Sequence, residues 1–146
     1  MEEPLQSVEP VAVEGRIRIP YRWPAGRVAG RFLAALRDYG LLLGLRCPRC
    51  RTVGFPPRPR CLKCRAASEE WVPVGPDGAV STWTVHRRLE PPQVLAVVVP
   101  DGADGGMLHR LIDIEPGAVQ SGMRVTAVLA EERRGSIEDL AGFRPL

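Results

Sequence analysis

All four cysteines of the chain lie in one short stretch, and they are its clearest chemical feature. They form two C-x-x-C pairs, Cys47-Pro48-Arg49-Cys50 and Cys61-Leu62-Lys63-Cys64, with ten residues between the pairs. Each pair can place two thiolates on one ion from a tight turn, and the intervening loop lets the second pair complete a tetrahedral shell. Soft thiolate ligands in this geometry select zinc, or iron in a four-thiolate site. The spacing therefore predicts a structural metal site, with zinc as the expected ion.

Two other uses of the cysteines fit the sequence less well. Two disulfides would need an oxidising compartment, and nothing in the chain marks secretion. A redox dithiol needs a single C-x-x-C at the start of a helix, whereas here two pairs flank a proline-rich loop. A closed shell of four sulfurs also has no open position for substrate, so we expect no catalysis at the metal.

Composition places the chain among ordinary globular proteins. The chain has 146 residues, which is enough for one medium domain or a small module plus a small barrel. Apolar residues make up 45% and charged residues 25%, as is usual for such proteins. No apolar run approaches the roughly 20 residues of a membrane helix, and the N-terminus MEEPLQSVEP lacks a signal-peptide pattern. We therefore expect a cytoplasmic protein that does not enter a membrane.

Positive charge is concentrated around the cysteines. Seven basic residues and no acidic residue lie between Arg46 and Arg65, so the net charge of +3 leaves about −4 for the rest (+3 minus +7). This basic segment favours a phosphate-bearing or acidic partner. It also fits a simpler interpretation, in which the basic residues offset the negative charge of four thiolates around a divalent ion.

The segment before the cysteines predicts an arm followed by a helix. Residues 1–20 read as a flexible lead-in arm, in which Ile17 and Ile19 alternate with arginines as in a short edge strand or an arm lying on a partner. Residues 27–38 then place Val28, Phe32 and Leu36 on one helical face, with Pro24 in the first turn and Gly40 as the end. That face must dock, either on this chain or on another subunit.

The cysteine pairs lie among short strands. We expect strands over residues 41–46, 52–55 and 70–72, which together make a three-stranded zinc ribbon.

After the turn at residues 75–78 the pattern changes to a run of short strands. We expect strands at 80–89, 94–99, 107–114 and 124–130, a helical insertion at 116–122, a short helix at 136–140 and a C-terminal edge strand at 143–145. The continuous apolar run 94–99 predicts a strand covered on both faces. Such an order fits a five-stranded OB-type barrel, with a small sandwich as the alternative.

Catalytic motifs are missing from the sequence. It contains no G-x-S-x-G, H-E-x-x-H, Walker or dinucleotide fingerprint, and we interpret His86 and His109 as polar strand positions. Asp101, Asp104 and Asp113 stand near turns, where acids are usually only solvated. Arg87 and Arg88 end the first barrel strand beside a Pro-Pro loop, where they are candidates for contacts to ligand phosphates.

In this order the motifs are similar to those of a known family. The match runs from about Arg18 to Leu146 and includes the Phe55-Pro56-Pro57-Arg58 loop between the cysteine pairs, the Gly122-Met123-Arg124-Val125 turn and the Phe143-Arg144-Pro145 end. The chain resembles the acyl-CoA-associated proteins that carry a rubredoxin-like zinc ribbon and an OB-fold domain, typically encoded beside thiolase-like enzymes. Residues 1–15 fall outside the resemblance.

The resemblance implies an accessory subunit without catalytic residues of its own. Such a subunit binds a thiolase or a thiolase-like aldolase as a hetero-oligomer and helps to hold acyl-CoA. It implies Cys47, Cys50, Cys61 and Cys64 as the ligands of a structural zinc ion. It also implies a division into an arm (1–20), a helix (21–40), a zinc ribbon (41–74) and an OB-fold barrel (75–146).

Two other functions remain open at this point. A nucleic-acid-binding module would use the same two folds, but only 5% of the residues are aromatic and the barrel half is not basic. An iron electron carrier of the rubredoxin kind would use the same four cysteines.

Overall fold

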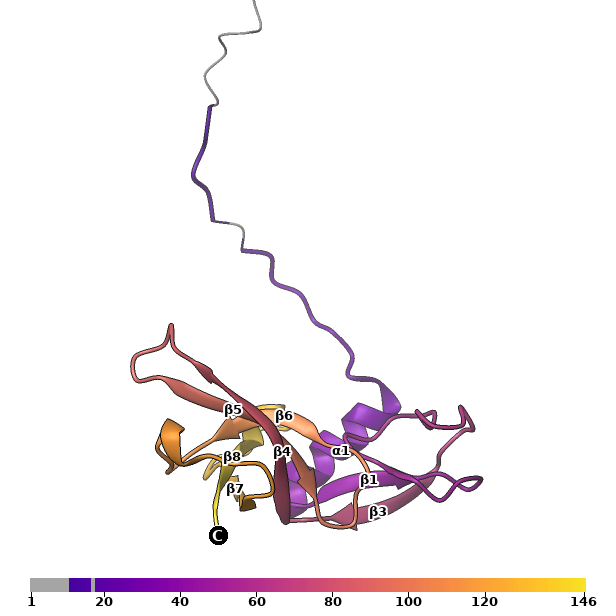
Figure 1. Ribbon diagram of the computed structural model, residues 1–146. Coiled ribbons are helices and arrows are strands. Elements are labelled where there is room, and N and C mark those ends of the chain that lie inside the picture. Colours follow the sequence, from indigo (N-terminus) through magenta and orange to yellow (C-terminus); the bar gives the residue numbers. More distant parts are fainter. Residues whose placement is uncertain (1–10, 17) are drawn as a thin grey trace, which may run out of the picture.

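A helix, a small sheet and a barrel follow one another along the chain (Figure 1). The structure is a computed structural model that describes residues 11–16 and 18–146. The bounds are α1 Gly26–Tyr39, β1 Leu42–Arg46, β2 Val53–Gly54, β3 Glu70–Val74, β4 Asp77–His86, β5 Gln93–Pro100, β6 Met107–Leu111, η1 Pro116–Ala118, β7 Arg124–Leu129, η2 Ile137–Asp139 and β8 Leu140–Pro145. Among the described helices, none has the length and apolar character needed to cross a membrane.

Helix α1 extends one residue beyond the predicted range 27–38 at each end, but the prediction for Pro24 is wrong. Pro24 lies before the helix rather than in its first turn, and the first helical residue is Gly26. Gly40 ends the helix as expected, in the left-handed region at φ 67°, and its N–H donates to the carbonyl of Leu36 at 3.1 Å. A Cβ there would stand 2.6 Å from Leu129 Cδ1, but this is the movable end of a side chain, so the left-handed φ is the main reason for glycine.

Only the C-terminal half of α1 docks on the rest of the chain. Phe32, Ala35 and Leu36 are buried, and the ring of Phe32 packs edge-on against Phe55 with 6.0 Å between centroids. Val28, one turn earlier, is only half-buried. The C-terminal part of the helix's apolar face therefore docks on its own chain. This is one of the two alternatives that the sequence left open, the other being docking on another subunit.

The three-stranded ribbon predicted from the sequence is confirmed. Strand β1 lies between β2 and β3 and is antiparallel to both, so that Leu45 pairs with Gly54 on one side and with Trp71 on the other. Strand β2 is only two residues long, so most of the ribbon's connection consists of the two cysteine turns and the proline-rich loop.

The OB-type barrel is also confirmed, in the order β4-β5-β6-β8-β7, with β7 pairing back to β4. The predicted C-terminal strand is present, but the prediction that it lies at an edge is wrong. Strand β8 pairs with β7 along its whole length and meets β6 at Leu111 and Phe143, and Phe143 is fully buried. The sequence of residues 143–145 gave no sign of this burial, because the strands that cover β8 come from other parts of the chain.

Strand β5 also differs from the prediction that both its faces are covered. Val94, Ala96 and Val98 are buried, whereas the intervening residues Leu95, Val97 and Val99 are only half-buried. Neighbouring Leu108 on β6 is 61% exposed. The strand is apolar on both sides, but within the described residues only the barrel interior covers one side fully.

Helix, ribbon and barrel share one hydrophobic core. A single cluster of buried residues includes Phe32 and Leu36 of α1, Phe55 next to β2, and Val98 and Phe143 of the barrel. Burial of this apolar area is the main source of stability, and it holds the three parts in one arrangement.

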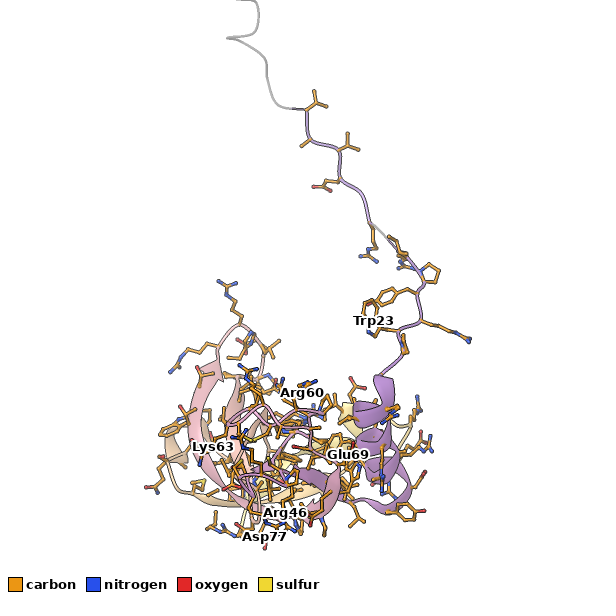
Figure 2. The ribbon with its side chains drawn as sticks, turned by 90° about the vertical axis from the view of Figure 1, so that its right-hand side faces the viewer. Trp23, Arg46, Arg60, Lys63, Glu69 and Asp77 are labelled. Atoms are coloured by element: carbon orange, nitrogen blue, oxygen red, sulfur yellow. The ribbon has the colours of Figure 1, made fainter. Side chains whose placement is uncertain are left out.

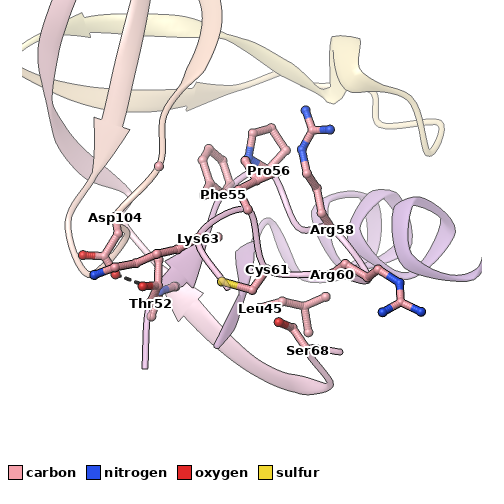
Figure 3. A pocket seen from close by; sticks show the side chains of 14 residues that line it. Leu45, Thr52, Phe55, Pro56, Arg58, Arg60, Cys61, Lys63, Ser68 and Asp104 are labelled. Atoms are coloured by element: carbon pink, nitrogen blue, oxygen red, sulfur yellow. Dashed lines mark hydrogen bonds between the residues drawn. The ribbon is translucent and has the colours of Figure 1, made fainter. Parts of the chain in front are cut away.

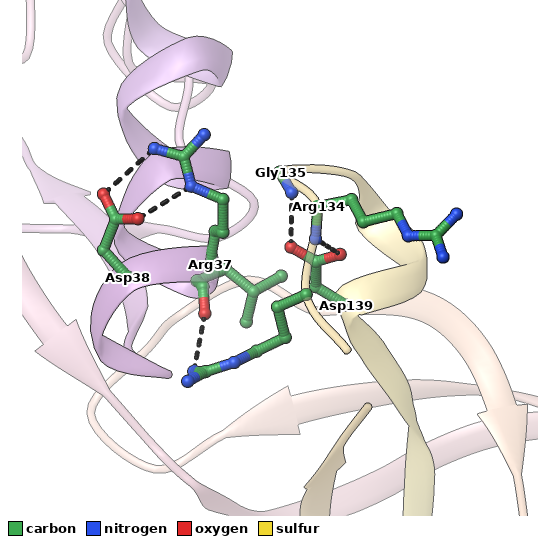
Figure 4. A network of polar contacts seen from close by, with 7 residues as sticks. Arg37, Asp38, Arg134, Gly135 and Asp139 are labelled. Atoms are coloured by element: carbon green, nitrogen blue, oxygen red, sulfur yellow. Dashed lines mark hydrogen bonds and ion pairs between the residues drawn. The ribbon is translucent and has the colours of Figure 1, made fainter. Parts of the chain in front are cut away.

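The loop between β7 and β8 fastens the helix to the barrel (Figure 4). Arg133 Nη1 donates to the carbonyl of Leu36 at 3.2 Å, close to the C-terminal end of α1. Asp139 is 2% exposed and accepts from the backbone N–H groups of Arg134 at 2.8 Å and Gly135 at 2.7 Å. Burial by itself raises the pKa of Asp139, but these N–H groups outweigh it and hold the pKa below its usual value.

We expect Phe143→Ala to lower the free energy of unfolding by about 3–5 kcal/mol, because it leaves a cavity at the centre of the barrel. Urea unfolding followed by tryptophan fluorescence measures this change. The matched control is Leu108→Ala, on a neighbouring strand but exposed, which should change stability by less than about 0.5 kcal/mol. Equal small effects of both substitutions would contradict a buried C-terminal strand.

We expect Asp139→Asn to destabilise the protein most at neutral pH. Since the folded-state pKa of Asp139 is depressed, its ionised form stabilises the fold above the unfolded pKa, and this contribution is lost as pH falls through the folded pKa. The difference in unfolding free energy between wild type and Asp139→Asn should therefore shrink as pH falls from neutrality through the acidic range. A difference that is constant over this range would show that the charge has no part in the effect.

Candidate metal centre and neighbouring surfaces

The two cysteine pairs adopt the same hydrogen-bonded turn. In the first, the N–H of Arg51 donates to Cys47 O at 3.0 Å and the N–H of Cys47 donates to Thr52 O at 2.9 Å. In the second, Arg65 and Cys61 make the corresponding bonds to Cys61 O and Ala66 O, at 3.0 and 2.9 Å. Arg51 and Arg65 both have φ of 62°, the left-handed conformation that turns the chain back after the second cysteine. The repeat places four sulfurs on one centre.

The four sulfurs converge as the spacing predicted. All lie within 4.8 Å of one another, and the Sγ–Sγ distances are 3.4 Å for Cys47–Cys64 and 3.5 Å for Cys50–Cys61. Four sulfurs each about 2.3 Å from a zinc ion would be separated by about 3.8 Å, so the residues present fit a tetrahedral ion. The four cysteines are free, which contradicts the disulfide alternative.

The sulfurs experience opposed electrostatic effects. The side chain of Thr52, 3.3 Å from Cys50 Sγ, lowers the pKa of the Cys50 thiol to about 6. For Cys64 the backbone N–H of Ala66 lowers the pKa, but the sulfur of Cys47, burial and the other sulfurs outweigh it and raise the pKa to about 11. Four thiolates this close repel one another, and a divalent cation at their centre is what allows all of them to ionise.

One acidic residue forms ion pairs with the basic segment, residues 46–65, at the ribbon. Glu70 of β3 forms ion pairs with Arg46 and with Arg51, the latter at 3.6 Å. No other basic residue between Arg46 and Arg65 forms an ion pair with a described acidic residue. Most of the positive charge of the segment is therefore available to thiolates or to a partner.

A pocket of about 140 Å³ lies where the second cysteine turn meets the barrel (Figure 3). Leu45, Phe55 and Pro56 are among its apolar lining residues, and Arg58, Arg60 and Lys63 stand around it. In Figure 3 these three cationic side chains point in different directions rather than toward one point. Among the described residues that line the pocket, these cations do not converge on one point for a phosphate group.

The β5–β6 loop clamps the ribbon onto the barrel at the edge of this pocket. Asp104 Oδ2 accepts from the N–H of Val53 at 2.7 Å, and the N–H of Asp104 donates to the carbonyl of Val53 at 2.9 Å. The next residue is Gly105, where a Cβ would stand 2.7 Å from the carbonyl oxygen of Phe55. The backbone contact therefore requires glycine, and it fixes β2 against the barrel.

The interpretation of the turn acids as merely solvated was wrong for two of them. Asp104 makes the hydrogen bonds to Val53 described above. Asp101 forms a bidentate ion pair with Arg124 at 2.8 and 2.5 Å, which holds the pKa of Asp101 below its usual value. Neither partner is near in the sequence, so no local pattern could have indicated these contacts. Thr52 was also missed, although its position two residues after Cys50 could have pointed to it.

Arg87 and Arg88 do not join the cysteine site. Both are exposed in the turn that connects β4 to β5, and this hairpin projects from the barrel at the end away from the ribbon (Figure 1). Among the described residues no ion pair engages either arginine. The two arginines are thus free to meet a ligand or partner, with Glu90 the nearest acid along the chain.

The two histidines show no catalytic arrangement in the described part of the chain. His86 is exposed at the end of β4. His109 is half-buried and packs edge-on against Phe143 with 6.0 Å between centroids; burial lowers the pKa of its imidazole. No hydrogen bond between described residues joins either side chain to a carboxylate or hydroxyl. Both fit the interpretation as strand positions.

Comparison with known proteins gives the same two parts in the same order. Residues 34–70 match the family described as the rubredoxin-like zinc ribbon domain of ChsH2, and residues 71–130 match its C-terminal OB-fold domain. A DUF35 domain-containing scaffold protein of Methanocaldococcus jannaschii is 35% identical over 101 residues, which cover 64% of this chain and 70% of that protein. This chain belongs to the ChsH2 (DUF35) family.

Two solved structures share the fold of this ChsH2-family chain. One, named Ltp2-ChsH2(DUF35) aldolase, is 26% identical with a TM-score of 0.61, and the alignment covers 84% of this chain and 98% of that one. The other, a DUF35-family protein of unknown function from Sulfolobus solfataricus, has a TM-score of 0.62 at 20% identity, and the match covers 82% of this chain and 84% of that one. The family membership confirms the resemblance seen in the motifs.

We expect the purified protein to contain one zinc ion per chain, and Cys61→Ser to lose it together with the folded ribbon, because structural zinc contributes roughly 10–16 kcal/mol of apparent binding energy in small folds. Metal analysis by mass spectrometry and hydrogen exchange of the β1 amides measure the two effects. Arg49→Ala, between two cysteines but exposed, is the matched control and should keep the metal. Protein without metal, or with the visible spectrum of an iron–thiolate site, would contradict the zinc assignment.

Proposed function

We propose that this chain is a non-catalytic accessory subunit that binds a thiolase-like enzyme and helps to hold its acyl-CoA substrate. The observation that carries the proposal is the match of ribbon and barrel together to ChsH2, including 98% coverage of the matched chain of the Ltp2-ChsH2(DUF35) aldolase. The scaffold name of the archaeal relative supports the same kind of role. In this proposal the catalytic residues belong to the partner.

Within this proposal the metal ion has a structural role and no catalytic one. Cys47, Cys50, Cys61 and Cys64 hold a structural zinc ion, and their shell leaves no position for substrate. Zinc in such a site supplies no chemistry beyond binding and charge neutralisation. The residues 41–74 then form a rigid base, held to the barrel of residues 75–146 by the Asp104 clamp and the common core.

Arg87 and Arg88 are the proposed contacts to the phosphates of coenzyme A. Guanidinium groups bind phosphate oxygens with two parallel N–H donors, and both arginines are exposed at the tip of a projecting hairpin. A hairpin tip that extends beyond the barrel can reach the surface of an enzyme on which the barrel rests. The half-buried outer side of β5, with Leu95, Val97 and Val99, supplies apolar area for such a contact.

The test co-expresses the chain with a thiolase-like enzyme from the same genome. We expect the two proteins to elute as one complex and the chain to raise the enzyme's activity on acyl-CoA. Separate elution with unchanged activity would reject the proposal. Salt-sensitive binding to single-stranded oligonucleotides would instead favour the nucleic-acid alternative.

The arginine assignment has its own measurement. We expect Arg87→Ala/Arg88→Ala to weaken acyl-CoA binding to the complex by about tenfold or more for each phosphate that no longer has a guanidinium partner, since a charged hydrogen bond contributes about 1.5–3 kcal/mol. Isothermal titration of the complex with acyl-CoA measures the affinity. Arg58→Ala/Arg60→Ala, which removes the same charge from the ribbon, is the control and should bind normally.

A further inference from the structure

The N-terminal arm, defined here as residues 11–25, exposes an unusual set of apolar side chains. Its exposed residues include Val11 at 91%, Val13 at 88%, Ile19 at 71%, Tyr21 at 79% and Trp23 at 84%. Aromatic residues make up only 5% of the chain, yet two of them stand here within three positions. Figures 1 and 2 show the described residues of the arm, 11–16 and 18–25, running away from the folded body, with Trp23 clear of it. Exposure of this kind marks a surface that a partner covers.

The exposed residues of the arm follow a period of two. The apolar residues Val11, Val13, Ile19, Tyr21 and Trp23 all occupy odd positions, whereas the charged residues Glu14, Arg16, Arg18 and Arg22 occupy even ones. In an extended chain, alternate residues share a side, so in the extended form this pattern presents an apolar side and a basic side. It carries three arginines and one acid, and Arg27 follows in the first turn of α1.

The arm's own sequence favours the extended form. Pro20 and Pro24 fix their φ angles, and each disfavours helical conformation in the residue before it, which is Ile19 or Trp23. The described residues of the arm form neither helix nor strand. A segment already restricted to extended conformations loses less conformational entropy when it docks, which favours binding.

A groove lies on the body beside the start of α1, where the arm joins the helix. This groove of about 370 Å³ lies between the N-terminal half of α1 and the ribbon, and its lining includes Arg27, Val28, Arg31 and Trp71. Arg31 lies over the Trp71 ring, with 4.8 Å from Cζ to the ring centroid. Arginines and an aromatic ring therefore stand beside the arm on the body, together with the acid Glu69, next to the helical half that its own chain leaves partly uncovered.

We propose that residues 11–25 are a docking strand that lies extended in an apolar, carboxylate-rimmed groove on the thiolase-like enzyme, with Tyr21 and Trp23 as its anchors. This inference rests on the proposed function for the identity of the partner. The apolar side of the arm enters the groove, and Arg16, Arg18 and Arg22 face acidic residues on its rim. Charge steers the encounter, while the two aromatic side chains hold the bound state.

The experiment measures the affinity of the full-length chain for the purified thiolase-like enzyme. We expect Tyr21→Ser/Trp23→Ser to weaken binding by roughly 30-fold or more, as loss of central aromatic anchors does. The matched control is Tyr39→Ser at the far end of α1, which is 77% exposed and should bind within about twofold of wild type. Because neither Tyr21 nor Trp23 is buried, the thermal unfolding of the double variant should equal that of wild type.

Two further measurements are specific to docking of the arm. Backbone hydrogen exchange in peptides covering residues 11–25 should slow when the complex forms. Replacement of Arg16, Arg18 and Arg22 by alanine should reduce the dependence of association rate on salt, whereas Arg58→Ala/Arg60→Ala should not.

The outcomes separate this inference from the function on which it rests. If wild type binds the enzyme but the double variant binds equally well, or if the arm stays unprotected in the complex, the docking strand is rejected and the accessory role stands. If wild type self-associates and the double variant is monomeric, a second copy is the occupant and the inference is wrong. If wild type does not bind the enzyme at all, both proposals fall.

Discussion

Mutual repulsion among four thiolates is the constraint on which the ribbon depends. The sulfurs of Cys47, Cys50, Cys61 and Cys64 lie within 4.8 Å of one another, and only a cation at their centre makes that arrangement favourable. Around the cysteines the ribbon has few strand pairs, because β2 is two residues long and the proline-rich loop forms no strand. The equivalent turns at the two cysteine pairs are therefore the real framework of this part of the molecule.

The metal site does not stand alone, because the ribbon is joined to the barrel by both polar and apolar contacts. The Asp104 clamp and the close approach at Gly105 fix β2, while Phe32, Phe55 and Phe143 belong to one buried cluster. The loop around Asp139 and Arg133 adds a second polar connection, from barrel to helix. The helix, ribbon and barrel are therefore held together by several independent contacts.

What the rigid body leaves exposed is as informative as what it buries. The hairpin tip with Arg87 and Arg88, the outer side of β5 and the arm with Trp23 belong to three different parts of the chain. Each presents groups that gain from a partner, namely free guanidinium groups, apolar strand surface and aromatic rings. The accessory role proposed above would give these surfaces a common use, which is contact with a partner enzyme.

The amino-acid sequence by itself determined the features that depend on residues close together in the chain. Cysteine spacing predicted the four-sulfur site, the spacing of Phe32 and Leu36 predicted the helix, and alternation predicted the barrel strands, because each pattern reflects a turn, a helical period or a pleat within a few residues. Only the tertiary structure decided that β8 is central, that one face of β5 lacks full cover, and that Asp104 and Asp101 bind distant partners. Those outcomes depend on which strands become neighbours, and contacts between residues 23 to 51 positions apart leave no local pattern in the sequence.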